Sequence, residues 1–530
     1  DERLHQRENA VQHAERHHAA EQGRIGVPDQ LYDKQQMPDG GFDFFRERLG
    51  ADAFFIDIGS ATTGITHADI PRNFKITYYY SIPRLQIQVF SEALAFCTDF
   101  GYNRKRNIQS VLRGADMKEQ MCFGKADILL PDFIGDAEAC RKWAVIACDQ
   151  FTGEPEYWHA VEHFVGDAPS TLHMILPEAY LGGDNAAELA KIAATMKRYR
   201  DTLLHTYRDA LVFVRRTQSD GRVRCGIVGA VDLECYDYAA GSTSPIRATE
   251  GTVFERLPPR VAVRRNAVLE APHVMLLIDD PKDTVIGALK AERESLPKLY
   301  DFDLMQHGGH LEGYLLDGSA ADATLARMRE RFAKNGADLE LAVGDGNHSL
   351  ASAKARYEEV KAKIGEAAAL RHPLRYALCE VVNLHDEALE FEPIYRLVKT
   401  DTPDELLDGL RALGERCEPG TESVECVGAR QCRRILLGAG THALTVGTLQ
   451  LYLDAYVASH PGSSVDYIHG RDALMRLAAA PGHVGFLFDG MRKEELFPAV
   501  ERSGALPRKT FSMGHAEDKR YYMECREIAK

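Results

Sequence analysis

The sequence predicts an α/β protein of mixed α+β character, with multi-layer mixed sheets, flanking helices and a smaller α/β region toward its C-terminal end. Three observations predict this class. Short apolar runs of strand length alternate with segments of helical periodicity. The 530 residues suffice for about three domains of ordinary size. A content of 45% hydrophobic and 27% charged residues is typical of soluble globular proteins.

The charge and the cysteines narrow the function classes. A formal net charge of -15 argues against a nucleic-acid partner, which needs clustered cations, and favours small-molecule ligands. The 11 cysteines show no CxxC and no zinc-ligand spacing, which indicates reduced thiols in a cytoplasmic protein. No apolar run approaches the roughly 18 residues that would span a bilayer, so we expect no membrane insertion. The sequence indicates no oligomeric state.

Residues 1–116 differ from the rest. Residues 1–43 are rich in Gln, His, Glu and Arg, and the apolar runs in 44–116 have no consistent period. The pattern changes at Met117, which could itself be an initiator. We expect 1–116 to be a non-homologous extension, either disordered or added by an over-extended gene prediction. A real but poorly ordered extension is the open alternative.

The first elements after Met117 form a sheet with flanking helices. Residues 143–148 are a continuous apolar run that predicts a buried strand ending at Asp149 and Gln150. Because ligands of α/β proteins often bind at strand ends, both are candidate substrate-binding residues. Helical spacing predicts helices over 155–165 and 185–207. Further strands are expected at 210–215, 224–234 and 274–278.

The next elements form a strand, glycine loop and helix unit. A helix over 321–334 precedes a strand at 339–343 and a helix over 349–364. Strands follow at 375–383 and 389–398, and a helix starts at 402 with a Thr cap and Pro just inside. We place a boundary near Thr400, so that 117–400 is the main domain and 401–530 a smaller α/β region. Its expected strands lie near 434–437, 443–446 and 484–488, and its helices near 449–458, 471–479 and 493–501.

The glycine loop carries the best candidate site. Two glycines flank an acid, so the backbone can turn tightly and approach a ligand closely. Uncapped amides at the following helix start would attract a phosphate or carboxylate, although Asn347 or Ser349 could cap that helix. His348 adds a titratable base, and Asp345 a carboxylate that could orient it or bind a metal. A purely structural turn is the alternative. The loop residues are Gly344, Asp345, Gly346, Asn347, His348 and Ser349.

Three other segments contain candidate chemistry. Arg247 could contact a phosphate, and Glu250 could accept a proton from a substrate hydroxyl. Lys509 lies in a basic, hydroxyl-rich segment, 507–512, that could clamp phosphates. A salt-bridged turn and a solvated surface cluster are the respective alternatives. His307 and His310 are separated by two glycines without a third ligand nearby, so we expect no metal site there.

Seven segments with specific sequence carry a family resemblance: 126–131, 143–149, 154–158, 166–170, 300–304, 343–348 and 391–394. By these, the chain from Met117 to Lys530 resembles the family catalogued as domain of unknown function number 1015. Residues 1–116 take no part in it.

A second likeness concerns the loop alone. It is similar to the phosphate loop of the sulfiredoxin and ParB-like superfamily, which includes free-serine kinases and whose members bind nucleotides. The resemblance implies that Asp345, Asn347 and His348 contact phosphates and that Glu250 is the base. Relatives often have Asp-Gly-His-His-Arg here, whereas this chain has Asn347 for the first His and Ser349 for the Arg. The positive charge of the missing Arg would then have to come from Arg247, Lys354 or Lys509.

These observations lead to one hypothesis and two alternatives. The hypothesis is a nucleotide-dependent phosphotransferase that acts on a small hydroxylated metabolite, with free serine as a candidate, using ATP or ADP with Mg²⁺. The first alternative is a non-catalytic regulatory protein that binds a nucleotide or an amino acid. The second is a hydrolase of phosphate esters that uses Asp345 or His348.

Overall fold

The computed structural model describes residues 121–529 with short gaps. The described ranges are 121–181, 185–239, 241–252, 257–335, 338–416, 422–428, 432–437, 444–507 and 509–529. The predicted extension, 1–116, and the proposed initiator Met117 lie outside them. None of the helices in these ranges combines the length and the apolar character that a bilayer crossing requires.

The larger sheet has 11 strands in the described part of the chain. Their order is β10-β11-β4-β5-β13-β9-β12-β7-β6, while β1 pairs with β5 and β2 with β4. The parallel and antiparallel pairs make it a mixed sheet, as predicted. The strands are β1 (Phe123–Gly124), β2 (Ala126–Pro131), β4 (Leu204–Thr217), β5 (Val223–Asp232), β6 (Tyr236–Asp237), β7 (Ile246–Ala248), β9 (Met275–Ile278), β10 (Lys298–Asp303), β11 (His310–Leu316), β12 (Leu341–Asp345) and β13 (Tyr376–Asn383).

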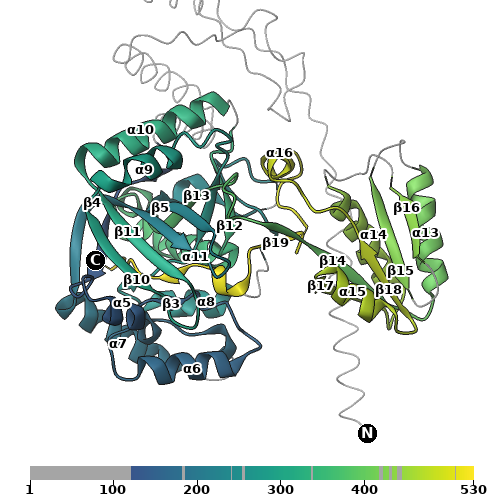
Figure 1. Cartoon of the computed structure of the whole chain (residues 1–530), viewed down its shortest axis with the longest axis horizontal. Helices are drawn as coiled ribbons and strands as arrows, with labels where there is room; N and C mark the ends of the chain where they lie inside the picture. Colours follow the sequence, from purple (N-terminus) through teal and green to yellow (C-terminus); the bar gives the residue numbers. More distant parts are fainter. Residues whose placement is uncertain are drawn as a thin grey trace, which may run out of the picture. The chain divides into compact units, whose positions relative to one another are not determined.

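Helices cover both faces of this sheet (Figure 1). On one face, α9 (Ile286–Glu292), α10 (Gly318–Asn335) and α11 (Asn347–Ile364) form a core with Ile227 and Val231 of β5. On the other face, α5 (Ala137–Trp143), α6 (Pro155–Val165) and α7 (Ala186–Thr202) form a core with Val228 and Ala230 of the same strand. Because both faces are covered, β5 is apolar almost throughout rather than alternating.

A second sheet follows in the sequence. Its order is β16-β15-β18-β14-β17, and β19 also pairs with β14. Val398, Leu406, Leu449 and Phe486 are buried in its core. The elements are β14 (Phe391–Lys399), β15 (Ser423–Gly428), β16 (Cys432–Leu436), β17 (Ser464–His469), β18 (His483–Leu487), β19 (Phe511–Met513), α13 (Pro403–Arg416), α14 (Thr445–Ser459), α15 (Arg471–Ala478) and α16 (Leu496–Ser503).

The C-terminal segment, residues 514–529, returns to the elements around the larger sheet, where Figure 1 shows it in yellow. Its strand β20 (Tyr521–Tyr522) pairs with β3 (Val145–Ile146), and β21 (Arg526–Glu527) pairs with β8 (Leu269–Glu270). Both pairings, and that of β14 in the second sheet, cross the boundary expected near Thr400. The division into 117–400 and 401–530 stays a prediction.

A buried network of ion pairs connects this segment to the larger sheet. Arg520, whose side chain is 4% exposed, forms ion pairs with Glu380 of β13 and with Glu524. The two carboxylates are 2% and 0% exposed, and the Tyr300 hydroxyl donates to Glu524. Gly226 on the neighbouring strand β5 leaves room for the Glu380 side chain, because a Cβ at residue 226 would overlap with it.

The end of one predicted helix and one predicted strand were wrong. The helix expected over 185–207 ends at Thr202, and residues 204–217 form β4, because this segment pairs with three other strands. The strand expected at 443–446 instead overlaps the start of α14 at Thr445. Pairing and packing with distant segments outweigh local periodicity at both places.

Candidate active site

The predicted strand, glycine loop and helix unit is confirmed. Strand β12 ends at Asp345, Gly346 adopts a left-handed conformation with φ 80°, and α11 begins at Asn347. The predicted cap by Asn347 or Ser349 does not form, because the cap residue of the helix is Gly346, which makes no side-chain cap hydrogen bond. Gly346 occupies the cap position and places both residues inside the first turn. The cap residue therefore offers no side-chain acceptor to the first amides of α11.

The two glycines of the loop allow close packing on β9. A Cβ at residue 344 would lie 2.8 Å from Leu277 Cγ. A Cβ at residue 346 would lie 3.1 Å from the Cα of Val274 and 3.4 Å from Cδ2 of His273. The loop backbone therefore lies directly against His273.

Replacing Gly346 with alanine is expected to destabilise the fold more than replacing Gly221, a glycine of the turn between β4 and β5. The two glycines have φ 80° and 85°, and a positive φ of this kind costs an L-residue roughly 1–2 kcal/mol. A Cβ at residue 221 meets nothing within 4 Å, whereas one at residue 346 presses on backbone. Guanidinium unfolding of G346A and G221A measures the difference. Equal losses for the two variants would show that the contact with Val274 does not matter.

The parallel pairing of β7 with β12 brings Glu250 to the loop. Ala248 is opposite Val343, so the two strands end at the same edge of the sheet. Thr249 Oγ1 donates to the Val343 carbonyl at 2.6 Å, and Asn347 Nδ2 donates to Thr249 Oγ1 at 3.4 Å. Burial, followed by the charge of Asp345, raises the pKa of Glu250 above its ordinary value. Two segments that are distant in the sequence therefore form one acidic site.

Two lysines of the C-terminal region contact these carboxylates. The backbone amide of Lys509 donates to Glu250 Oε1 at 3.2 Å, while its Nζ lies 5.4 Å from the centre of the Tyr467 ring. Lys519 Nζ lies 3.4 Å from Asp345 Oδ2. Arg247 is buried, and its Nε donates to the Ser244 carbonyl at 2.8 Å. The ammonium beside the loop acid is thus that of Lys519, which the sequence did not single out.

A cavity of about 330 Å³ lies beside the first turn of α11. His348 and Ser349 line it, as does Asp149, while Glu250 and Asp345 are not among its lining residues. Part of its wall is apolar and includes Met174, Leu176 and Val263. Helix α8 (Leu257–Arg265), which packs against α11, contributes Arg260 and Arg264.

A chain of polar contacts at the cavity joins four residues, Asp149, Gln150, His273 and Tyr522. Gln150 Nε2 donates to Asp149 Oδ1 at 3.0 Å, and His273 Nε2 lies 3.5 Å from Asp149 Oδ2. His273 Nδ1 lies 2.7 Å from the hydroxyl of Tyr522, which accepts a hydrogen bond from the Cys148 amide at 3.1 Å.

The contacts between Asp149 and His273 favour the charged form of both. Burial alone would lower the pKa of His273, but Asp149 beside it, with Asp345 and Glu178, raises it above the ordinary value. Burial alone would raise the pKa of Asp149, but the charge and hydrogen bond of His273 hold it well below its usual range. The contact therefore favours the ion pair of the two side chains over their neutral forms.

Sequence reasoning missed His273, Lys519 and Tyr522. His273 lies two residues before β9, a strand that was predicted correctly. Because β9 runs antiparallel to β12, its beginning lies at the same edge as the end of β12. Finding His273 would have required the direction of β9. Finding Lys519 and Tyr522 would have required knowing that the C-terminal segment returns to the larger sheet.

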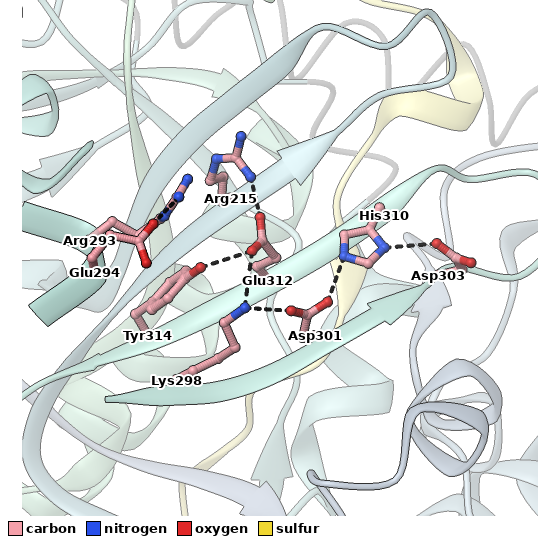
Figure 2. A network of polar contacts seen from close by, with 9 residues as sticks. All are labelled: Arg215, Arg293, Glu294, Lys298, Asp301, Asp303, His310, Glu312 and Tyr314. Carbon is pink, nitrogen blue, oxygen red and sulfur yellow. Dashed lines mark hydrogen bonds and ion pairs between the residues drawn. The ribbon is translucent and has the colours of Figure 1, made fainter. Parts of the chain in front are cut away.

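Of the two histidines His307 and His310, His310 belongs to a different network of polar contacts (Figure 2). His310 Nδ1 lies 2.8 Å from Asp303 Oδ1, and its Nε2 lies 2.8 Å from Asp301 Oδ1. Lys298 connects Asp301 to Glu312, which also contacts Arg215 and Tyr314. Within the described ranges, no group of three or more His, Cys, Asp or Glu side chains is placed to bind a metal. The pairing of opposite charges explains this cluster.

A family model described as a protein of unknown function, DUF1015, matches residues 135–527. The chain belongs to this family. No curated protein matches the chain. The resemblance stated from the sequence motifs is thereby confirmed, and the DUF1015 match includes the loop, Glu250, His273 and the C-terminal segment.

Solved structures similar to this DUF1015 chain include a free serine kinase in complex with AMP, at 13% identity and a TM-score of 0.31, covering 55% of this chain and 92% of that one. A conserved hypothetical protein from Pyrococcus furiosus has 13% identity and a TM-score of 0.28, covering 54% and 94%. SbnI with a C-terminal truncation, from Staphylococcus aureus, has 12% identity and a TM-score of 0.28, covering 54% and 82%. At these TM-scores, the function of this chain has to be argued from its own geometry. The sulfiredoxin and ParB-like character of the loop stays a prediction.

Proposed function

We propose that this protein is a nucleotide-dependent phosphotransferase that acts on a small hydroxylated metabolite. One observation carries the proposal. The first turn of α11, which follows a glycine cap, lies at one edge of the larger sheet beside a cavity, together with a carboxylate of raised pKa at Glu250 and the ammonium of Lys519. Phosphoryl transfer needs positioned phosphates, cations and a proton acceptor, and each of these requirements has a candidate group here.

The phosphates would bind at the start of α11. Its amides and helix dipole favour an anion, and His348 and Ser349 face the adjacent cavity. Lys519 supplies the positive charge that the family-typical arginine would provide at Ser349. Asn347 Oδ1 is buried without a hydrogen-bond partner among the described residues, so a ligand hydroxyl or amino group could satisfy it.

The proposed nucleotide is ATP or ADP, and Mg²⁺ would accompany it. Mg²⁺ prefers oxygen ligands and is commonly held by one or two carboxylates together with phosphate oxygens and water. Asp345 is the loop carboxylate available for this role. The metal would neutralise charge on the phosphates.

The acceptor would bind near Asp149 and Gln150. Its hydroxyl oxygen forms a bond to the terminal phosphorus of the nucleotide, the bond from that phosphorus to the bridging oxygen breaks, and the shortened nucleotide leaves. The hydroxyl proton passes to Glu250, because a raised pKa makes its carboxylate a better proton acceptor.

A second candidate is a non-catalytic protein that binds a nucleotide or an amino acid and regulates a partner. One observation favours it: Glu250 accepts a hydrogen bond from the Lys509 amide and is not part of the cavity lining. A carboxylate in that position can serve the fold alone.

Phosphorus NMR of the purified protein distinguishes these functions. ATP, ADP and CTP are each incubated with Mg²⁺ and serine. A new phosphate-ester resonance, with loss of the terminal phosphate of the nucleotide, is the expected result. Release of inorganic phosphate alone would indicate a hydrolase. Broadened nucleotide resonances without any turnover would contradict the proposal and favour the binding protein.

A further inference from the structure

His273 contacts two partners through its two ring nitrogens. Nε2 faces the Asp149 carboxylate at 3.5 Å, and Nδ1 lies 2.7 Å from the Tyr522 hydroxyl. The imidazole is therefore not placed to take a proton from a ligand, although it is part of the cavity lining. Any effect that it has on a ligand passes through Asp149.

We propose that His273 is a positioning residue that holds Asp149 in place as the hydrogen-bond acceptor for the ligand of this cavity. Asp149 lines the cavity, and 27% of its side chain is exposed. An ionised carboxylate has about four acceptor positions, of which His273 and Gln150 face two. The remaining positions are available to a ligand.

Tyr522 and Gly346 hold the imidazole from two sides. The Tyr522 hydroxyl is itself fixed by the Cys148 amide, and Tyr522 lies on β20, which pairs with β3 just before Asp149. The backbone of Gly346 packs on the edge of the His273 ring, where a Cβ would lie 3.4 Å from Cδ2. The imidazole therefore connects the glycine loop to the residues that follow β3.

The charges of the cavity define the class of ligand. Arg260 pairs with Glu178, and Arg264 pairs with Glu270, so these cations already have carboxylate partners within the protein. Asp149 and His273 form a third pair. A cavity balanced in this way favours a neutral or zwitterionic ligand with hydroxyl or amino donors over a further anion. Its volume is at the lower end of the roughly 300–1,000 Å³ typical of ligand sites, which indicates a small metabolite.

This inference deepens the proposed function, because it assigns the cavity to the acceptor and the start of α11 to the phosphates. The ionisable groups facing His273 are Asp149, Asp345, Glu178 and Tyr522, each from a different segment. Burial raises the pKa of Tyr522, so its hydroxyl stays protonated. Lys519 acts on Asp149 from the C-terminal segment.

The first test is an NMR titration of the histidine ring carbons, which needs no knowledge of the ligand. His273 is expected to titrate above the ordinary value of about 6.5, and Asp149→Asn is expected to lower its pKa, because the strongest interaction that favours the charged ring is removed while burial still opposes it. His273→Gln identifies the resonance. His310→Gln is the matched control, since it removes a histidine flanked by two carboxylates outside the cavity lining. A pKa at or below 6.5 in the unmodified protein, or an unchanged pKa in D149N, would overturn the inference.

The second test uses turnover of serine with ATP and Mg²⁺. Tyr522→Phe and His273→Gln are expected to raise the KM for the acceptor, by up to about 100-fold for the loss of a fixed orientation, and to leave the KM for the nucleotide unchanged. Tyr521→Phe is the control on the same strand. Equal effects on both KM values would indicate a merely structural role and refute the inference. Absence of turnover with every nucleotide would refute the proposed function, while the titration would still decide the role of His273.

Discussion

Replacement of Arg520 by methionine is expected to lower the free energy of unfolding by about 3–5 kcal/mol. Arg520 lies between Glu380 and Glu524, and all three side chains are almost fully buried. Methionine fills part of the volume but leaves two carboxylates without a counter-charge in a medium of low dielectric. Urea unfolding at neutral pH measures the loss.

The matched control is Arg222→Met. Arg222 also contacts two carboxylates, Asp220 and Glu390, but these pairs are exposed to solvent. Its replacement is expected to cost less than about 1 kcal/mol, because water screens such pairs. A loss of that small size for R520M would mean that Glu380 and Glu524 are not held there as charged groups. Combining R520M with E380L and E524M should recover much of the stability, since a buried apolar cluster of similar volume is often no worse than an ion pair.

Glu250→Gln is expected to lower kcat by about 10²–10⁴-fold if Glu250 is the base. Glutamine keeps the size of the side chain and its carbonyl oxygen can still accept the Lys509 amide, so the fold and nucleotide affinity should be unchanged. Only the ability to take up a proton is lost. Steady-state kinetics, together with calorimetric binding of ATP and Mg²⁺, separate the two properties.

The pH dependence gives an independent check on Glu250. A base must be deprotonated to act, so activity should fall as the pH falls through its pKa. Burial raises that pKa, which places the acidic limb of the profile above the ordinary value of 4.5. E250Q should remove this limb, whereas the exposed control Glu387→Gln should keep both the limb and the rate. Full activity of E250Q would exclude Glu250 as the base.

Local patterns were sufficient for the glycine loop and its flanking elements. The apolar run before Gly344, the glycines around Asp345 and the helical spacing after Ser349 predicted β12 and α11 to within two residues. These features are local, because a tight turn needs glycine and a buried strand needs an apolar run. The mixed α/β class followed from the same alternation. The prediction of the site residues was less complete. The side chains of Arg247 and Lys509 contact other partners.

Interactions between distant segments decided what the sequence could not predict. Strands β10 and β11 were missed, although Tyr300 and Phe302 are buried and alternate with the exposed Asp301 and Asp303. The polar contacts around His273 depend on an antiparallel strand and on a segment more than two hundred residues later in the chain. No local period carries that information.

The large sequence separation between the residues of the site has a consequence for biosynthesis. Cys148 and Tyr522, which share a hydrogen bond, are 374 residues apart. At about 5–20 residues per second, a ribosome needs roughly 20–75 seconds to pass from one to the other. A nascent chain can complete most of the larger sheet in that interval, yet it still lacks Tyr522, which lines the cavity, and Lys519, which contacts Asp345. The protein is therefore expected to become competent to bind its ligand only once translation has passed residue 522.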